Sequence, residues 1–231
     1  MTSTRLFALF ALLALPGLAS AQASIGMRAS YGLPAGDAYE QSGFGTFKQS
    51  GLAKGQVPLQ LDATWRFGKA LSAGLYLAYG FGSAGSKLKE LCATPGASCD
   101  RPSTLRYGVQ GAYTFSDGGR ADPWLGLAAG VESASFAVKN FVYGVLPGPP
   151  PSPLDGDLEG TLRGWDAALE GGFDHRLTGN VVVGPVLSYG VGQYRVEDVT
   201  ITGLGKVAGG GVDNAKTHQW FTFGLRGRFD L

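Results

Sequence analysis

Charged and amide side chains occur singly within stretches that otherwise alternate apolar and small residues. Because long charged side chains held in a narrow space are costly unless they pair, ion pairing is the chemistry that this pattern indicates. An eight-stranded barrel is just wide enough inside for side chains to fill it. We expect two layers across such a lumen, a middle layer of Arg28, Asp62, Tyr76, Gln110, Glu170 and Arg226 and a lower layer of Arg66, Asp174, Arg228 and Asp230.

The charges of the middle layer balance, since it holds two arginines and two carboxylates. Arg28 can reach Asp62 if the first two strands are neighbours, and Arg226 lies beside Arg28 once the barrel closes. We prefer the interpretation in which these groups only satisfy one another and plug the lumen. The alternative makes Arg28 and Arg226 a gate whose ion pairs can switch.

Two histidines are the candidate acid–base residues. Acyl transferases and deacylases use a His with a nearby Ser, and some proteases use Asp and His. His175 falls in a short turn at the wrong end of the chain's strands for such chemistry. His218 has Thr217 beside it and Asp213 before it, but adjacent strand residues face opposite ways. We therefore expect His218 to be a solvated residue at the rim, and we predict no enzyme, cofactor or metal site.

Cys92 and Cys99 are the only cysteines, and the turn Pro95-Gly96 lies between them. In an oxidising compartment two such cysteines form a local disulfide. A metal site would need more ligands than this segment offers. We predict a disulfide that staples a loop.

The beginning of the chain indicates export. Arg5 precedes the apolar run Leu6–Leu15, and Ala19-Ser20-Ala21 fits a cleavage site. We interpret residues 1–21 as a Sec signal peptide, with a signal anchor as the alternative, and residues 22–231 as one barrel domain. No later segment offers the roughly 20 apolar residues of a membrane helix, and a net charge of +1 argues against a nucleic-acid partner.

Eight segments alternate with a period of two, which is the period of a β-strand. In Val57–Phe67 the apolar side chains occupy every second position, and polar groups lie between them. The predicted strands are Ala23–Leu33, Val57–Phe67, Leu71–Phe81, Ser103–Phe115, Trp124–Ser133, Thr161–Asp174, Asn180–Arg195 and a last strand that ends at Leu231.

The connectors between these strands alternate between long and short. This rhythm predicts an all-β fold, an eight-stranded antiparallel up-and-down transmembrane β-barrel with N- and C-termini periplasmic. In the third long connector we expect Phe136–Leu146 to extend a hairpin and Gly148–Pro153 to be a polyproline loop. The long connectors are Pro34–Gln56, Gly82–Pro102, Ala134–Gly160 and Val196–Lys216.

Alternation alone does not say which face is inside, and a soluble lipocalin-like barrel would turn its apolar face inward. The small residues of the other face favour a crowded lumen, and the aromatic residues fall into two belts around an aliphatic band, as on lipid-facing barrels. The periplasmic belt comprises Trp65, Phe67, Phe115, Phe173 and Phe229, and the outer belt comprises Tyr31, Tyr79, Phe81, Tyr107, Trp165, Tyr189 and Phe221.

The end of the chain, Trp220–Leu231, alternates apolar residues and carries Phe229 two positions before its last residue. It resembles the C-terminal signal strand of outer-membrane proteins. Across residues 22–231 the chain resembles the small eight-stranded outer-membrane barrels, the OmpA/OmpX/OmpW-like family. The resemblance implies a Gram-negative outer-membrane location, insertion by the barrel assembly machinery, and contact with outer-membrane lipid and lipopolysaccharide.

Loops on a rigid scaffold are where binding usually occurs. The four long outer loops are rich in Gly, Ser and Pro and include apolar patches at Phe44–Phe47 and Phe136–Val145. We therefore predict a structural or surface-interaction role, with an extracellular ligand or host surface as partner. Transport of small hydrophobic molecules, which the OmpW-like resemblance implies, is the alternative.

Overall fold

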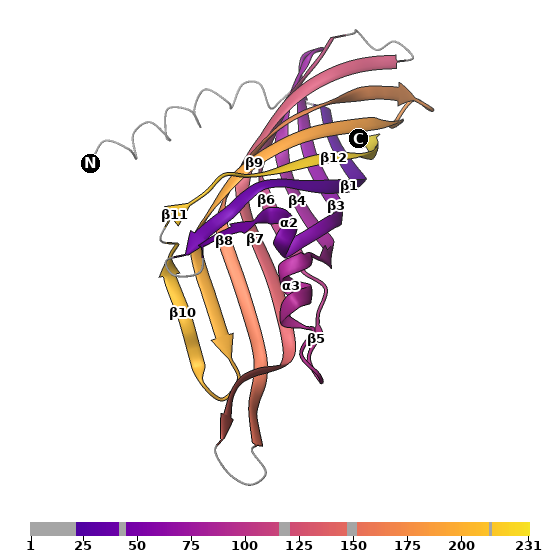
Figure 1. Cartoon of the computed structure of the whole chain (residues 1–231). Coiled ribbons are helices and arrows are strands. Elements are labelled where there is room, and N and C mark those ends of the chain that lie inside the picture. The colour runs from indigo at the N-terminus through magenta and orange to yellow at the C-terminus, as the bar shows by residue number, and fades with distance from the viewer. Residues whose placement is uncertain (1–21, 42–44, 116–120, 147–151, 213) are drawn as a thin grey trace, which may run out of the picture.

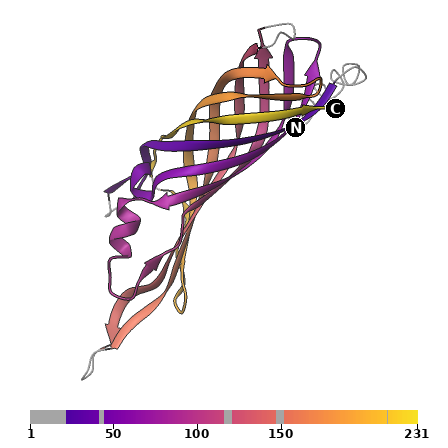
Figure 2. The same cartoon turned by 90° about the vertical axis from the view of Figure 1, so that its right-hand side faces the viewer.

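The chain folds into a closed barrel of long antiparallel strands (Figure 1, Figure 2). The computed structural model describes residues 22–41, 45–115, 121–146, 152–212 and 214–231. In spatial order the barrel strands are β1 (Gln22–Gln41), β3 (Ala53–Phe67), β4 (Leu71–Ala84), β6 (Ser103–Thr114), β7 (Ala121–Leu146), β8 (Ser152–Arg176), β9 (Val181–Ile201) and β12 (His218–Asp230). Because β1 pairs with β3 on one side and with β12 on the other, the ring of eight is complete.

In the described part of the chain, six shorter elements connect successive barrel strands, all toward one end of the barrel (Figure 1). They are β2 (Gly45–Lys48), α2 (Gln49–Leu52), α3 (Ser86–Leu91), β5 (Ser98–Cys99), β10 (Gly205–Gly211) and β11 (Asn214–Ala215). The strands β2 and β11 pair with β1, whereas β5 pairs with β7 and β10 pairs with β9. No helix among the described residues is long and apolar enough to cross a membrane.

The other end of the barrel carries the tight turns and both ends of the described chain. Gly68, between β3 and β4, has a φ of 67°, which glycine adopts at no steric cost. Ser24 lies opposite Asp230 in the ladder between the first and last barrel strands. An up-and-down ring with an even number of strands brings its two termini to the same end in this way.

Apolar side chains point out of the barrel, and polar ones point into it. Leu61, Leu75 and Val109 are 56%, 55% and 58% exposed on the outer wall. The buried set includes many charged and amide side chains from every second position of the same strands. A lipocalin-like barrel with an apolar lumen does not have this arrangement, so the predicted orientation of the two faces is confirmed.

The strands are longer than predicted on the side of the long connectors. Much of the predicted long connector Ala134–Gly160 is a hairpin of β7 and β8, with Val138 opposite Leu158. Ser152 and Pro153 also belong to β8, so the polyproline prediction is wrong there, while residues 148–151 lie outside the described residues. Backbone groups that pair across a hairpin need no other partner, which favours strand over open loop. The predicted extension of the hairpin through Phe136–Leu146 is confirmed.

Two other predicted long connectors, Pro34–Gln56 and Val196–Lys216, also contain paired strands. Between Pro34 and Gln56 the chain continues as β1, then forms β2 and α2 before β3 begins. Between Val196 and Lys216 the chain completes β9 and returns as β10. The outer end of the barrel therefore continues as a folded extension, and its small apolar core is formed by Ala38, Tyr39, Leu162 and Tyr194.

Candidate functional site

The middle of the lumen is organised around the guanidinium of Arg28. Its Nε donates to Asp62 Oδ2 at 3.0 Å, its Nη1 to Glu170 Oε2 at 2.5 Å, and its Nη2 to Gln110 Oε1 at 2.9 Å. The four side chains come from β1, β3, β8 and β6, and all are buried. Gln110 Nε2 and Gln60 Nε2 both donate to Asp62 Oδ1, at 3.1 and 2.7 Å. One cation thus links two carboxylates across the barrel.

Arg226 and Tyr76, the other two residues of the predicted middle layer, make different contacts. Arg226 lies opposite Arg28 in the ladder, but its guanidinium carbon is 4.6 Å from the ring centroid of Trp124, a cation–π contact. Its Nε has no hydrogen-bond partner among the described residues. The Tyr76 hydroxyl is 3.3 Å from a carboxylate oxygen of Asp166, a residue outside the predicted middle layer.

The lower lumen contains a second ion-pair cluster. Arg228 Nη1 is 2.9 Å from Asp174 Oδ2, and Arg228 Nε is 2.8 Å from Asp230 Oδ1. Trp124 Nε1 also donates to Asp174 Oδ1 at 3.1 Å, which connects this cluster to the stacked Arg226. Arg66, the fourth residue predicted for this layer, is partly buried on β3.

A third cluster near the outer end of the lumen was missed by sequence reasoning. His218 and Glu132 are each 1% exposed, and His218 Nε2 lies 3.0 Å from Glu132 Oε2. The His218 ring stacks on Tyr194 with centroids 4.2 Å apart, and Tyr194 donates to Glu132 Oε1 at 3.0 Å. Gln49 of α2 donates to the Tyr194 hydroxyl at 3.3 Å. The outer cluster of these four residues therefore fastens α2 to the lumen.

The prediction of a solvated His218 is wrong. The apolar core of the outer extension covers His218, because β1, β8 and β9 run on beyond the expected rim. The alternation in β7 could have identified Glu132 as the partner of His218, because Trp124, Ala128 and Glu132 all fall on the inward face of that strand. That phase also accounts for Trp124, which is 4% exposed and belongs to the lumen.

Small cavities separate these clusters. A cavity of about 30 Å³ lies among Arg28, Tyr76, Arg106 and Asp166, and one of about 10 Å³ lies beside Arg226. These volumes correspond to a few water molecules at most. At the outer end Leu88 of α3 is buried at 1% exposure.

The outer wall displays the predicted aromatic residues. All twelve residues of the two predicted belts are exposed on it, from Trp65 at 36% to Phe115 at 61%. Neighbouring rings contact one another, for example Tyr31 with Phe223 at 5.8 Å and Tyr189 with Phe221 at 5.6 Å between centroids.

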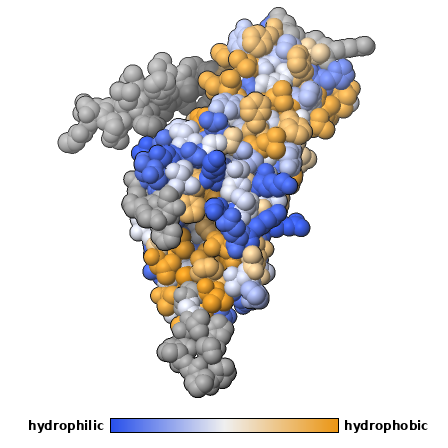
Figure 3. Space-filling model, in the orientation of Figure 1, coloured by the Kyte–Doolittle hydropathy of each residue, from blue (hydrophilic) through white to orange (hydrophobic). Residues whose placement is uncertain are grey.

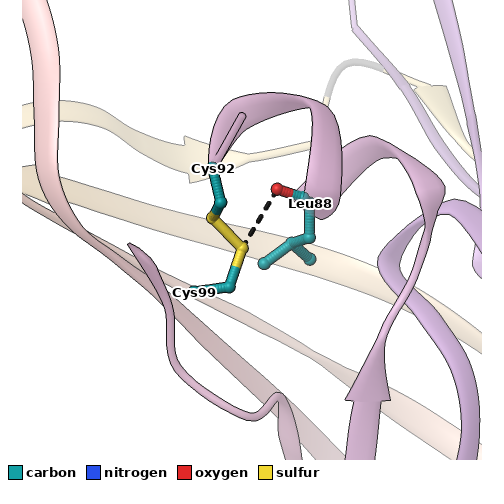
Figure 4. Close-up of a disulfide and its surroundings, with 3 residues drawn as sticks. All are labelled: Leu88, Cys92 and Cys99. Atoms are coloured by element: carbon teal, nitrogen blue, oxygen red, sulfur yellow. Dashed lines mark hydrogen bonds between the residues drawn. A yellow bond between two sulfur atoms is a disulfide. The ribbon is translucent and has the colours of Figure 1, made fainter. Parts of the chain in front are cut away.

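The predicted disulfide is present, and it joins the end of α3 to β5 (Figure 4). Cys99 Sγ lies 3.1 Å from the carbonyl oxygen of Leu88, a close contact, since a disulfide sulfur has no proton to donate. The bridge positions α3 against the strand that pairs with β7.

In the extension, Lys139 and Asp157 form a partly exposed ion pair across the β7–β8 hairpin, with Nζ 3.1 Å from Oδ2. The Asn140 backbone N–H also donates to Asp157 Oδ1 at 3.2 Å. These two hydrogen bonds, the one from Asn140 first, lower the pKa of Asp157. The hydrogen bond to Asp157 raises the pKa of Lys139.

No protein-family model and no curated protein matches this chain. Solved structures do match it. Neisserial surface protein A aligns with 90% of this chain and 97% of its own, at 14% identity and a TM-score of 0.52. The outer membrane protein OprG from Pseudomonas aeruginosa aligns with 91% of this chain and 96% of its own, at 14% identity and a TM-score of 0.51.

A major outer membrane protein from Thermus thermophilus aligns with 90% of this chain and 99% of its own, at 13% identity and a TM-score of 0.52. The chain has the fold of the small outer-membrane β-barrels. This confirms the predicted eight-stranded antiparallel barrel and the resemblance to the OmpA/OmpX/OmpW-like group, while the periplasmic position of the termini stays a prediction. At such identities the likeness concerns the fold, and the role of this outer-membrane-type barrel rests on its own residues.

Proposed function

We propose that this protein is an integral outer-membrane barrel with a plugged lumen, whose folded outer extension interacts with a surface or ligand outside the cell. The observation that carries the proposal is the combination of an apolar outer wall with a lumen crossed by three hydrogen-bonded clusters. Exposed apolar patches of this extent are costly in water and are satisfied by lipid.

The orientation follows from the exported chain and the two ends of the barrel. We place the tight turns and both termini in the periplasm and the extension outside, as in barrels with short periplasmic turns and long outer loops. Residues 1–21 would direct export, and the barrel assembly machinery would insert residues 22–231. The two aromatic belts would then lie at the two interfaces of the membrane.

The plug is supported by the chemistry of the lumen. Each cluster joins strands from different sides of the ring, so a path for ions would require buried ion pairs to separate. Breaking such a pair is costly, because it leaves an unpaired charge in a low-dielectric space. We therefore retain the structural role for Arg28 and Arg226 over the switching gate. The burial of His218 and Glu132 argues in the same direction against an enzymatic role, since substrate has no access to them.

Planar-bilayer recordings test the plug. We expect the refolded wild-type protein to show no steady conductance, whereas a variant that empties the middle layer, Arg28→Ala with Glu170→Ala, should show brief openings. Exposed Arg163 of β8 provides a control, because Arg163→Ala removes charge outside the lumen. A steady wild-type current, or uptake of small solutes in a liposome-swelling assay, would support the transport alternative.

Cysteine labelling on intact cells tests the orientation. Asn140 lies in the outer extension and Thr178 in a tight turn at the other end, and both are exposed. A membrane-impermeant maleimide should label the Asn140→Cys variant on intact cells and the Thr178→Cys variant only after the outer membrane is permeabilised. The native cysteines are in a disulfide and leave the background low. The reverse pattern would contradict the proposed orientation.

A further inference from the structure

A groove of about 440 Å³ opens on the outer wall of the barrel, where β1 separates from β3. The last residue pair of this ladder is Gly32 with Gln56, and beyond it β1 pairs with β2. The groove is lined by the exposed apolar side chains of Tyr31, Val57 and Phe81. Gly55 of β3 and Gly82 of β4 also line the groove, and the Tyr31 hydroxyl packs closely against Gly55.

The groove lies at the level of the outer aromatic belt. Tyr31 and Phe81 belong to that belt, and the ring of Phe81 packs edge-on against Tyr79 with centroids 4.9 Å apart. Aromatic belts mark the depth at which lipid headgroups begin. A ligand that enters the groove from the outer wall therefore enters from the membrane, at the boundary between acyl chains and headgroups.

One basic residue lines the groove, and a second lies next to the lining residue Gly55 in the chain. Arg101 lines the groove and is exposed, and the Gly82 N–H donates to the carbonyl oxygen of Pro102 at 2.7 Å, which fixes Arg101 beside β4. Lys54, directly before Gly55, is exposed at an irregularity of the β3–β4 ladder. Neither basic residue forms an ion pair within the described part of the chain. Figure 3 shows a hydrophilic band between the apolar barrel wall and the apolar outer extension.

We propose that this groove binds a phosphorylated lipid of the outer leaflet, with an acyl chain on Tyr31, Val57 and Phe81 and a phosphate between Arg101 and Lys54. The proposal rests on the proposed outer-membrane location. An apolar floor that faces the membrane suits a hydrocarbon chain, and two unpaired cations at headgroup level suit a phosphate, which accepts charge-assisted hydrogen bonds. The proposal concerns a retained lipid at one site, beyond the general contact of the barrel wall with the bilayer.

The test measures lipid binding to the refolded full-length barrel in neutral detergent micelles, with bisphosphorylated lipid A as the probe. The variant Lys54→Gln/Arg101→Gln should lower the apparent affinity about tenfold to thirtyfold, since each basic residue near an anionic lipid raises the binding affinity roughly fivefold. Ser83→Trp, which fills the groove from its exposed edge, should lower the affinity while it preserves both charges. The matched control Arg163→Gln/Arg195→Gln removes two exposed cations from β8 and β9, and should change the affinity less than about twofold.

Two further ligands distinguish binding of a phosphorylated lipid from binding of a hydrocarbon chain alone or of phosphate alone. Lipid A without its phosphates should bind the wild type as weakly as bisphosphorylated lipid A binds the double Gln variant, and inorganic phosphate at millimolar concentration should not displace the lipid. Equal losses in the groove and control pairs would overturn the proposal, as would full displacement by inorganic phosphate. Heat-modifiable gel migration and insertion into liposomes are measured on the same samples. A barrel that inserts but does not select phosphorylated lipid refutes this inference alone, whereas a chain that does not insert refutes the proposed function.

Discussion

The Arg28→Met variant tests whether the middle of the lumen is held together by one cation. Arg28 makes three hydrogen bonds, two of them to buried carboxylates, and methionine preserves most of its volume while it removes the charge. Removal of one partner from a buried ion pair costs about 3–5 kcal/mol, because the remaining charge has no compensation. We expect about 3 kcal/mol here, the lower end of that range, since Arg226 lies across the ladder from Arg28 and supplies a second positive charge in the same part of the lumen.

The assay is equilibrium unfolding in urea from lipid vesicles, followed by tryptophan fluorescence and gel migration. A loss of about 3 kcal/mol lowers the ratio of folded to unfolded protein by roughly two orders of magnitude. The triple variant Arg28→Met/Asp62→Asn/Glu170→Gln removes both orphaned charges and should recover most of the loss. Arg163→Met, which changes an exposed arginine, should leave the midpoint unmoved.

The reasoning would be refuted by either of two results. An Arg28→Met barrel within about 1 kcal/mol of the wild type would mean that the network does not stabilise the fold. A triple variant less stable than the single one would mean that the carboxylates stabilise the barrel without their cation.

Three further predictions concern the outer end of the barrel. His218→Gln removes the ring that stacks on Tyr194 and contacts Glu132. Amide hydrogen exchange in α2 should therefore accelerate while exchange in the lower barrel stays unchanged, and uniform acceleration would argue against a local latch. Replacing both cysteines by serine should destabilise the α3–β5 segment by up to about 2.5 kcal/mol, measured by hydrogen exchange there, and leave the barrel intact; barrel unfolding would contradict a staple. The hydrogen bond from the Asn140 N–H is the main cause that lowers the pKa of Asp157 below its ordinary value of 3.8. The ionised Asp157 therefore stabilises the hairpin fully above pH 3.8, and this stabilisation is lost as the pH falls through the lower pKa of the folded state. Asp157→Asn should remove this pH dependence from the hydrogen-exchange rates of the hairpin.

Much of the fold follows from local sequence, because the period of two is a local property of a strand. The inward phase of Arg28 and Asp62 and the outward phase of Leu61 and Leu75 can be read directly from alternation. Alternation does not say where a strand ends, and so the extension of the hairpin is predicted only through Phe136–Leu146 and the polyproline stretch Gly148–Pro153 is predicted to be loop. The described part of Ala134–Gly160 is strand because β7 and β8 pair with each other beyond the expected rim.

The sequence by itself determined which residues face the lumen and which face outward, and it indicated the disulfide across a short turn. The sequence also indicated that Arg28 can reach Asp62 on a neighbouring strand, but only the tertiary structure decided which lumen residues meet across the ring. His218 and Glu132 are 86 residues apart, and Tyr76 and Asp166 are 90 apart. Their heights in the lumen depend on the stagger of neighbouring strands, which is fixed only when the last strand pairs with the first and the barrel closes.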